Sequence, residues 1–356
     1  MKIFALLCEP ADYTLDLIAH VYDVRGITYA FVNNASVASA QEISGEERIV
    51  PRGLLGKLSF FCRILSRYDC LIINGYTGID CLCLILLNML SHRHPMTLES
   101  DTELRIPKQP LRRLVKWLWL HFLFTRKYVY GFAGGNYRHK DLFRFYGVME
   151  DRIFLAPMVV DNEKYALAER KVDACIFNFG YVGRLVDIKQ VDKIIAAIGL
   201  LVAKGHKVSL TVVGDGPERP RLERLATALP VEFTGKVFGE AKIRILHGID
   251  CLILYSSYEP WGLVVNEALA SGIPVIVSDK VGACKDLVEG DEPTGLVAKW
   301  DDVNDLAKKM EVMLSDSEER GKKQANAISR MSVWNYELYG QNFDSWLKVV
   351  ENEKVV

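Results

Sequence analysis

The sequence lacks long apolar runs and an excess of charge of one sign. Its most apolar stretch, residues 81–90, is only about half of the roughly 20 residues that a transmembrane helix needs. The apolar run at the beginning is broken by Glu9 and Asp12, so we expect a first strand there rather than a secretory signal. Because the formal net charge is −1, no general positive field would attract nucleic acid, and a nucleic-acid partner is not expected.

The eight cysteines include no Cys-x-x-Cys pair. That spacing is typical of zinc sites and redox-active thiols. Most of them lie within apolar stretches. We therefore expect buried, reduced thiols in a cytoplasmic protein.

The chain has 356 residues, of which 50% are hydrophobic, and this size favours two domains, with a cleft between them. Short apolar runs alternate with segments of helical periodicity, which predicts an α/β fold with parallel sheets. The expected strands are residues 2–8, 28–32, 70–74, 95–98 and 128–132, followed by 177–182, 208–213, 231–233, 251–255, 274–278 and 295–297. Periodicity lapses at residues 156–163, which are interpreted as a linker. The predicted domains are residues 1–160 and 161–332, and residues 333–356 are predicted to form a helix that returns to the first domain.

Two turns of the second half follow expected strands, which is where ligands bind in open α/β sheets. Residues 183–189 begin with Gly183 and contain Arg184 and Lys189, two cations that could clamp a diphosphate or could simply be solvated. The turn Gly214-Asp215-Gly216 precedes Pro217, which we expect at the first position of a helix whose free amides favour anions. A purely structural turn is the alternative.

A third turn, residues 259–262, leads into a helix expected to begin near Leu263. The amides of Gly262, Leu263 and Val264 would suit a phosphate at this helix end. Glu259 precedes the helix and Glu267 lies about one turn inside it, so both carboxylates could accept hydrogen bonds from the hydroxyls of one ligand. The alternative is an ordinary solvated helix start.

Together, these segments resemble the retaining glycosyltransferases of family 4, which have the GT-B fold of two Rossmann-like domains facing a central cleft. The matching segments, in the family's order, are YVGRLVDIK at 181–189, VVGDGPERPRLE at 212–223, VEFTGKV at 231–237 and EPWGLVVNEALASGIPVIVSDKVGACKDLV at 259–288. They cover nearly the whole second half.

The resemblance implies a donor site in the second domain and an acceptor site in the first. Arg184 and Lys189 would bind the donor diphosphate and stabilise the leaving group, Glu259 would contact the transferred sugar, and Glu267 would bind the ribose. The remaining donor-binding positions implied are Gly183, Gly214, Gly216, Gly235, Lys236, Val237, Gly262, Leu263 and Val264. Charge stabilisation by two cations and helix amides needs no metal. No cofactor or metal is therefore expected, and no Asp-x-Asp motif is present.

The first half resembles the family less. The glycine-rich loop that many relatives carry after the first strand is replaced by residues 8–13, and where relatives often place a histidine this chain has Glu99 and Asp101 after an expected strand. These two carboxylates are the acceptor-side candidates. His92 and His94 precede the strand and are interpreted as surface residues.

Residues 112–127 are basic with interleaved aromatic side chains. Such a segment could lie on an anionic membrane, which would place the protein at the inner membrane face. The alternative is an aromatic core helix with solvated ends, which is the more common role of such a helix.

The resulting hypothesis is a glycosyltransferase of the hexosyltransferase type. It would move a sugar from a nucleotide sugar, UDP-linked by preference or GDP-linked, to a glycan or lipid-linked acceptor in surface polysaccharide biosynthesis. A catalytically silent sugar-nucleotide-binding or scaffold protein of the same fold is the alternative. A nucleotide-dependent oxidoreductase is a weaker one, because no Gly-x-Gly-x-x-Gly follows a first strand.

Overall fold

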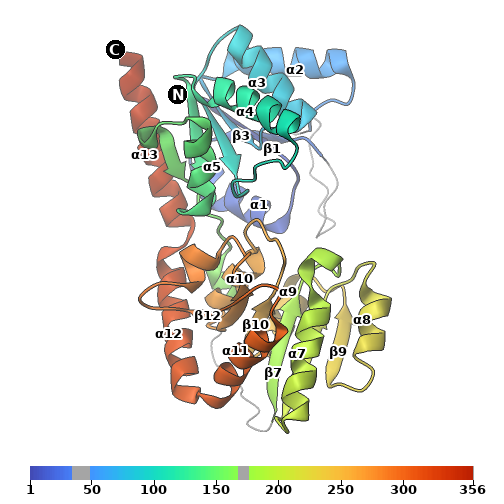
Figure 1. Cartoon of the computed structure of the whole chain (residues 1–356). Coiled ribbons are helices and arrows are strands. Elements are labelled where there is room, and N and C mark those ends of the chain that lie inside the picture. Colours follow the sequence, from blue (N-terminus) through green and yellow to red (C-terminus); the bar gives the residue numbers. More distant parts are fainter. Residues whose placement is uncertain (34–48, 167–175, 356) are drawn as a thin grey trace. The chain divides into compact units, whose positions relative to one another are not determined.

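The computed structural model describes residues 1–33, 49–166 and 176–355. The chain forms two compact units, Met1–Val159 with Tyr336–Val356, and Val160–Asn335. Each unit contains a six-stranded parallel sheet flanked by helices (Figure 1). The predicted α/β class with two parallel sheets is confirmed.

The sheet of the first unit has the strand order β2-β1-β3-β4-β5-β6. Its strands are β1 Ile3–Leu7, β2 Thr28–Phe31, β3 Cys70–Asn74, β4 Met96–Ser100, β5 Val129–Ala133 and β6 Ile153–Leu155. The edge strand β6 was not predicted, because three residues are too few to show a periodicity. The order reverses at β1, which lies between β2 and β3.

Alternate residues of these strands point to opposite faces of the sheet, and both faces are covered. In β1, Phe4 and Leu6 pack with the helices of one face, while Ile3, Ala5 and Leu7 face the other. The first face carries α2 Leu54–Arg67, α3 Ile79–Leu90, α4 Pro110–Phe124 and α5 Arg138–Tyr146. The second carries the π-helix η1 Ile18–Tyr22, which continues α1 Asp12–Leu17, and α13 Tyr336–Val355. A short turn, η3 Glu150–Arg152, precedes β6.

The C-terminal helix α13 belongs to the first unit although it follows the second unit in sequence. Its buried residues Tyr339, Phe343, Trp346 and Val350 recur at helical spacing and form one apolar stripe. This stripe packs on the sheet, where the Trp346 ring meets Phe132 edge to face at 5.4 Å. Apolar burial therefore attaches α13 to this sheet.

The sheet of the second unit has the order β12-β11-β10-β7-β8-β9. Its strands are β7 Phe177–Val182, β8 Val208–Val213, β9 Val231–Gly235, β10 Cys251–Leu254, β11 Val275–Ser278 and β12 Gly295–Ala298. The central strands β10 and β11 are buried along their whole length, as expected for parallel strands covered on both faces. The order reverses between β7 and β10.

The helices of the second unit connect these strands or follow the last of them, except for α6, which precedes β7. They are α6 Asn162–Tyr165, η4 Asp187–Lys189, α7 Val191–Ala203, α8 Arg219–Leu225, α9 Gly239–His247, α10 Leu263–Ala270, η5 Cys284–Val288, α11 Val303–Ser315 and α12 Ser317–Val333. The expectation that Pro217 begins a helix is wrong. The α8 helix begins at Arg219, after the cap residue Glu218, and Pro220 occupies the early helical position that proline favours.

The cysteines only partly follow the expectation of buried thiols. Cys70, Cys81, Cys251 and Cys284 are buried and Cys83 is half-buried, whereas Cys8 and Cys62 are exposed. All seven are free thiols, and Cys175 lies outside the described residues.

Candidate functional site

The point where the strand order of the second sheet reverses brings two predicted site segments together. From β7 the chain continues to β8 and β9, and from β10 it continues to β11 and β12 on the other side. The turns after β7 and β10 therefore border the crevice in which ligands of open α/β sheets bind. The Ser257 amide donates to the Ile188 carbonyl at 2.8 Å, which ties the two turns to each other.

Lys189 and Glu259, two of the predicted catalytic residues, form an ion pair at this point. Their side chains are 19% and 12% exposed. The Ser256 hydroxyl lies 3.4 Å from the same Glu259 oxygen, Oε2. The family resemblance implied that both residues bind the same donor, but it did not predict their mutual contact.

Two glycines let the turn after β8 approach the turn after β7. A Cβ atom at Gly214 would lie 1.9 Å from the Gly183 carbonyl oxygen, and one at Gly216 would lie 2.1 Å from the Leu185 oxygen. Gly214 also has a φ of +136°, a conformation that favours glycine. Its amide donates to the Gly235 carbonyl at 2.8 Å, so the end of β9 joins the same group of turns.

The third turn leads into α10 at Leu263, where the helix was predicted to begin. Its cap residue Gly262 has a φ of +96°, and none of the described side chains caps the helix. Glu259 is held before it by backbone pairing with Val281. The first amides of α10 are thus at a helix end with the partial positive charge that attracts anions.

Glu267 lies one turn inside α10 and receives two hydrogen bonds on one oxygen, Oε1. The Lys242 ammonium of α9 donates at 2.7 Å and the Tyr165 hydroxyl of α6 donates at 3.1 Å. The Lys242 nitrogen also lies 5.6 Å from the centre of the Tyr165 ring, within cation–π range. Sequence reasoning did not identify Lys242 or Tyr165, because neither lies in a recognisable turn.

The remaining donor candidates are more exposed. Arg184 is exposed, and its carbonyl accepts a hydrogen bond from the Tyr181 hydroxyl at 3.0 Å. Lys236 is exposed and Val237 half-buried, both directly after β9. Arg184 takes part in no ion pair with the residues that the structure describes.

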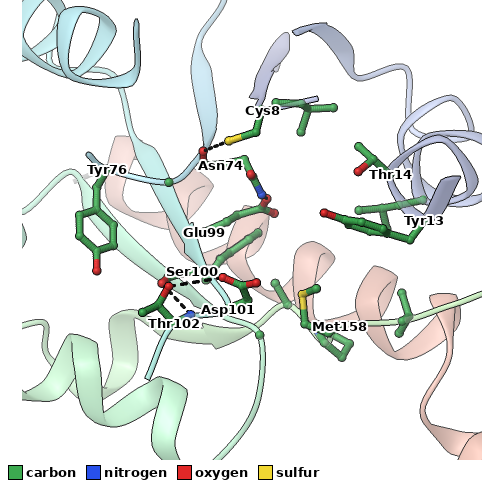
Figure 2. Close-up of a pocket in the computed structure, with 18 of the residues that line it drawn as sticks. Cys8, Tyr13, Thr14, Asn74, Tyr76, Glu99, Ser100, Asp101, Thr102 and Met158 are labelled. Atoms are coloured by element: carbon green, nitrogen blue, oxygen red, sulfur yellow. Dashed lines mark hydrogen bonds between the residues drawn. The ribbon is translucent and has the colours of Figure 1, made fainter. Parts of the chain in front are cut away.

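The first unit contains a cavity of about 450 Å³ at the corresponding point of its own sheet. It is bordered by the segments after β1, β3 and β4, beside the reversal of strand order. Both acceptor-side candidates, Glu99 and Asp101, line it (Figure 2). Its other polar or titratable lining residues are Cys8, Tyr13, Thr14, Asn74, Tyr76, Thr77, Ser100, Thr102, Arg105, Lys116 and Tyr339.

The two carboxylates of this pocket differ in environment. Glu99 is 8% exposed, and burial raises the pKa of its carboxyl. Its oxygens accept hydrogen bonds from the Tyr339 hydroxyl at 2.6 Å and the Asn74 amide at 3.0 Å. Asp101 is exposed, with the Thr102 hydroxyl 3.4 Å from its Oδ1 atom. Glu99 is thus the enclosed, ordered carboxyl of the pocket.

His92 and His94 do not line the pocket. Their rings stack at 5.0 Å, and the His94 Nε2 atom lies 2.8 Å from the Leu65 carbonyl oxygen. His92 is exposed, as expected of a surface residue, whereas His94 is half-buried.

Within the described part of the chain, no group of three or more His, Cys, Asp or Glu side chains is arranged to hold a metal ion. None of the helices in the described ranges combines the length and the apolar character that crossing a membrane requires.

Residues 177–330 match the family model of the glycosyl transferases group 1. The chain is 32% identical over 142 residues to a sulfoquinovosyl transferase of Arabidopsis thaliana, covering 39% of this chain and 27% of that protein. It is 35% identical over 112 residues to a GDP-mannose-dependent phosphatidylinositol dimannoside mannosyltransferase of Mycobacterium tuberculosis, covering 31% and 29%. The chain thus spans less than a third of the length of these two relatives.

Structural similarity extends over nearly the whole molecule. The crystal structure of HepE from Anabaena, solved in complex with UDP, superposes with a TM-score of 0.77 and 19% identity. The match covers 98% of this chain and 100% of HepE. The chain therefore has the GT-B fold, and its residues 177–330 carry the sequence pattern of the glycosyl transferases group 1.

Proposed function

We propose that this protein is a family 4 retaining glycosyltransferase that moves a sugar from a nucleotide sugar to a glycan or lipid-linked acceptor. The donor is UDP-linked by preference, with a GDP-linked sugar as the second choice, and the product contributes to a surface polysaccharide. Two relatives support the assignment by their names, a sulfoquinovosyl transferase and a GDP-mannose-dependent mannosyltransferase. UDP bound to HepE, a protein of the same fold, supports the UDP preference.

The observation that carries the proposal is the contact of Lys189 with Glu259 where the strand order reverses, inside the matched segment. A departing nucleoside diphosphate carries negative charge that a nearby cation stabilises. When the diphosphate binds, Lys189 turns to it and Glu259 becomes available to the hydroxyls of the transferred sugar. Arg184, exposed on the same turn, is the second cation.

The helix start at α10 supplies further donors. The amides of Gly262, Leu263 and Val264 bind the diphosphate, and no side chain in the described part of the chain competes for them as a cap. Glu267 binds the ribose hydroxyls through Oε2, since both of its hydrogen-bond donors contact Oε1. Gly183, Gly214 and Gly216 keep the neighbouring turns close, and the segment Gly235-Lys236-Val237 lies along the base. This chemistry requires no metal ion or other cofactor.

The acceptor binds in the pocket of the first unit. The polar side chains of Glu99 and Asn74 line this pocket. They suit sugar hydroxyls, which both donate and accept hydrogen bonds. Asp101 lies at a more exposed position of the same pocket.

Transfer is tested by incubating the purified chain with a panel of UDP- and GDP-sugars and candidate glycan acceptors. We expect one donor to raise the melting temperature and to be consumed with release of its nucleoside diphosphate. Lys189→Met should abolish consumption, whereas Lys204→Met, which removes an exposed cation paired with Glu311, should not. Binding without consumption under all conditions would favour the silent sugar-nucleotide-binding alternative and refute the enzyme.

The helix α4 supports association of the protein with an anionic membrane surface. Leu111, Leu114, Val115 and Leu118 are each more than half exposed. Exposed basic residues, Arg112 and Arg113 among them, adjoin this apolar surface. A helix with both properties binds anionic lipid by apolar insertion and charge attraction.

Flotation with vesicles of phosphatidylcholine, with and without phosphatidylserine, tests this association. The protein should float only with the anionic vesicles, and Leu114→Ser with Leu118→Ser should prevent it. Ile328→Ser is the control, because Ile328 is 61% exposed on α12 of the other unit. Equal recovery with both kinds of vesicle, or equal loss in the control, contradicts the proposal.

A further inference from the structure

The carboxyl of Glu99 is held on both oxygens by residues from two different elements. Asn74, the last residue of β3, donates to Oε2 at 3.0 Å, and Tyr339 of α13 donates to Oε1 at 2.6 Å. Figure 2 shows the Glu99 and Asn74 side chains meeting at the pocket. Two donors in different directions fix the carboxyl plane, because each oxygen has a preferred hydrogen-bond direction.

Tyr339 is itself held in place. Its ring lies in the apolar stripe of α13 and is 3% exposed. The Tyr22 hydroxyl of η1 lies 3.4 Å from the Tyr339 hydroxyl. Burial raises the pKa values of the Tyr22 and Tyr339 hydroxyls well above the usual range of tyrosine, so both hydroxyls stay protonated. Since the Tyr339 proton is donated to Glu99, the Tyr22 hydroxyl is oriented to donate to the Tyr339 oxygen.

We propose that Tyr339 is a positioning residue that aims the Glu99 carboxyl at a hydroxyl of the acceptor. The inference rests on the proposed function, because it gives the pocket of the first unit the role of acceptor site. The helix α13 therefore does more than close one face of the sheet. It supplies a functional hydroxyl from a residue 240 positions away from Glu99 in sequence.

The hydrogen bond from the Tyr339 hydroxyl also influences the protonation of the Glu99 carboxyl. Burial raises the pKa of Glu99, while the hydrogen bonds from Tyr339 and Asn74 lower it and oppose that effect. Other titratable groups around the carboxyl and along the same pocket are Cys8, Tyr13, Tyr22, Tyr76, Asp101, Arg105 and Lys116. Removing the Tyr339 hydroxyl leaves these groups in place, so the pKa of Glu99 should rise further.

A purely structural role for Tyr339 would be to attach α13 to the sheet. A matched control for that role exists on the same helix, where the Tyr130 hydroxyl donates to Glu353 at 2.6 Å. Tyr130→Phe removes a tyrosine–glutamate hydrogen bond between α13 and the sheet, and Tyr130 does not line the pocket. Comparing Tyr339→Phe with Tyr130→Phe therefore separates positioning from attachment.

The experiment is a pH titration of the full-length chain labelled with ¹³C-carboxyl glutamate, with Glu99→Gln used to assign the Glu99 signal. We expect Tyr339→Phe to raise the Glu99 titration midpoint by about one pH unit, and Tyr130→Phe to leave it unchanged. An unchanged midpoint in Tyr339→Phe, or an equal shift in Tyr130→Phe, overturns the proposal. Incorporation of 3-fluorotyrosine at position 339 gives a second test that preserves the packing. The more acidic phenol is a stronger donor, and the midpoint should fall.

Kinetics with the glycan acceptor that the transfer panel identifies complete the test. Tyr339→Phe should lower kcat/KM for the acceptor by about tenfold or more, with the donor KM unchanged, whereas Tyr130→Phe should retain both values. Equal losses in the two variants would reduce Tyr339 to an attachment residue and overturn the proposal. The titration needs no substrate, so it tests the positioning of Glu99 separately from the transferase activity of the wild-type chain.

Discussion

The ion pair between Lys189 and Glu259 permits a quantitative test of the proposed donor site without any ligand. Breaking a fully buried ion pair costs about 3–5 kcal/mol, while exposed pairs contribute about 0–1 kcal/mol. With side chains 19% and 12% exposed, Lys189→Met should lower the free energy of unfolding by an intermediate amount, about 2 kcal/mol. Glu259→Gln should cost less, because the long lysine side chain can extend its ammonium group into water.

The assay is urea unfolding of the wild type, the two single variants and the double variant. Because each single variant leaves one group of the pair without its partner, the double variant should lose about 1 kcal/mol less than the sum of the singles. Lys204→Met is the control, since its ion pair with Glu311 is more exposed, at 52% and 32%, and should cost less than about 1 kcal/mol.

The same substitution has a larger effect on catalysis if the donor diphosphate takes the place of Glu259. Lys189→Met should then lower kcat/KM for the nucleotide sugar by about 10²–10³-fold, the usual effect of removing a group that stabilises developing charge. In the unfolding experiment, the loss in the double variant could equal the sum of the two single losses to within about 0.5 kcal/mol. That result would show that the pair does not form in solution. Near-normal turnover by Lys189→Met would refute the role of the cation in transfer.

Three further predictions concern the turns and carboxylates of the two sites. Gly214→Ala should destabilise the chain by more than about 2 kcal/mol and abolish nucleotide binding, because its Cβ would lie 1.9 Å from a backbone oxygen. Gly205→Ala is the control, because Gly205 also has a positive φ but its Cβ would meet no described atom within 4 Å. This control should cost about 1 kcal/mol in urea unfolding. Lys242→Met should weaken binding of the nucleotide in calorimetry by about tenfold, because Glu267 loses its stronger donor; unchanged affinity would contradict this. Because the pKa of Glu99 is raised, the folded chain holds the Glu99 carboxyl proton more tightly than the unfolded chain does. The contribution of Glu99 to the free energy of unfolding therefore falls as pH rises from the ordinary glutamate pKa to the raised one. Glu99→Gln should remove that decline from a pH series of unfolding curves, and an identical decline would refute it.

Local sequence patterns were sufficient for most of the fold. Apolar runs located the strands of both sheets within a few residues, except for β6, which is too short to show a periodicity. The glycines after β8 predicted a turn there, but the close approach of this turn to the turn after β7 is visible only in the structure. Pro217 shows the limit of this reasoning, since two prolines lie near the helix start and only backbone geometry decides that Pro220 is the one inside α8.

The sequence by itself determined the parallel α/β class and located the turns that are proposed to bind the donor, because both depend on residues that are close together along the chain. Tertiary structure alone decided which side chains meet. It brings Lys242 and Tyr165 to one oxygen of Glu267, pairs Lys189 with Glu259, and carries Tyr339 to Glu99 across 240 positions. These contacts depend on strand order and on the docking of α13 through its apolar stripe. Local periodicity encodes neither, because the same stripe is compatible with any apolar sheet face.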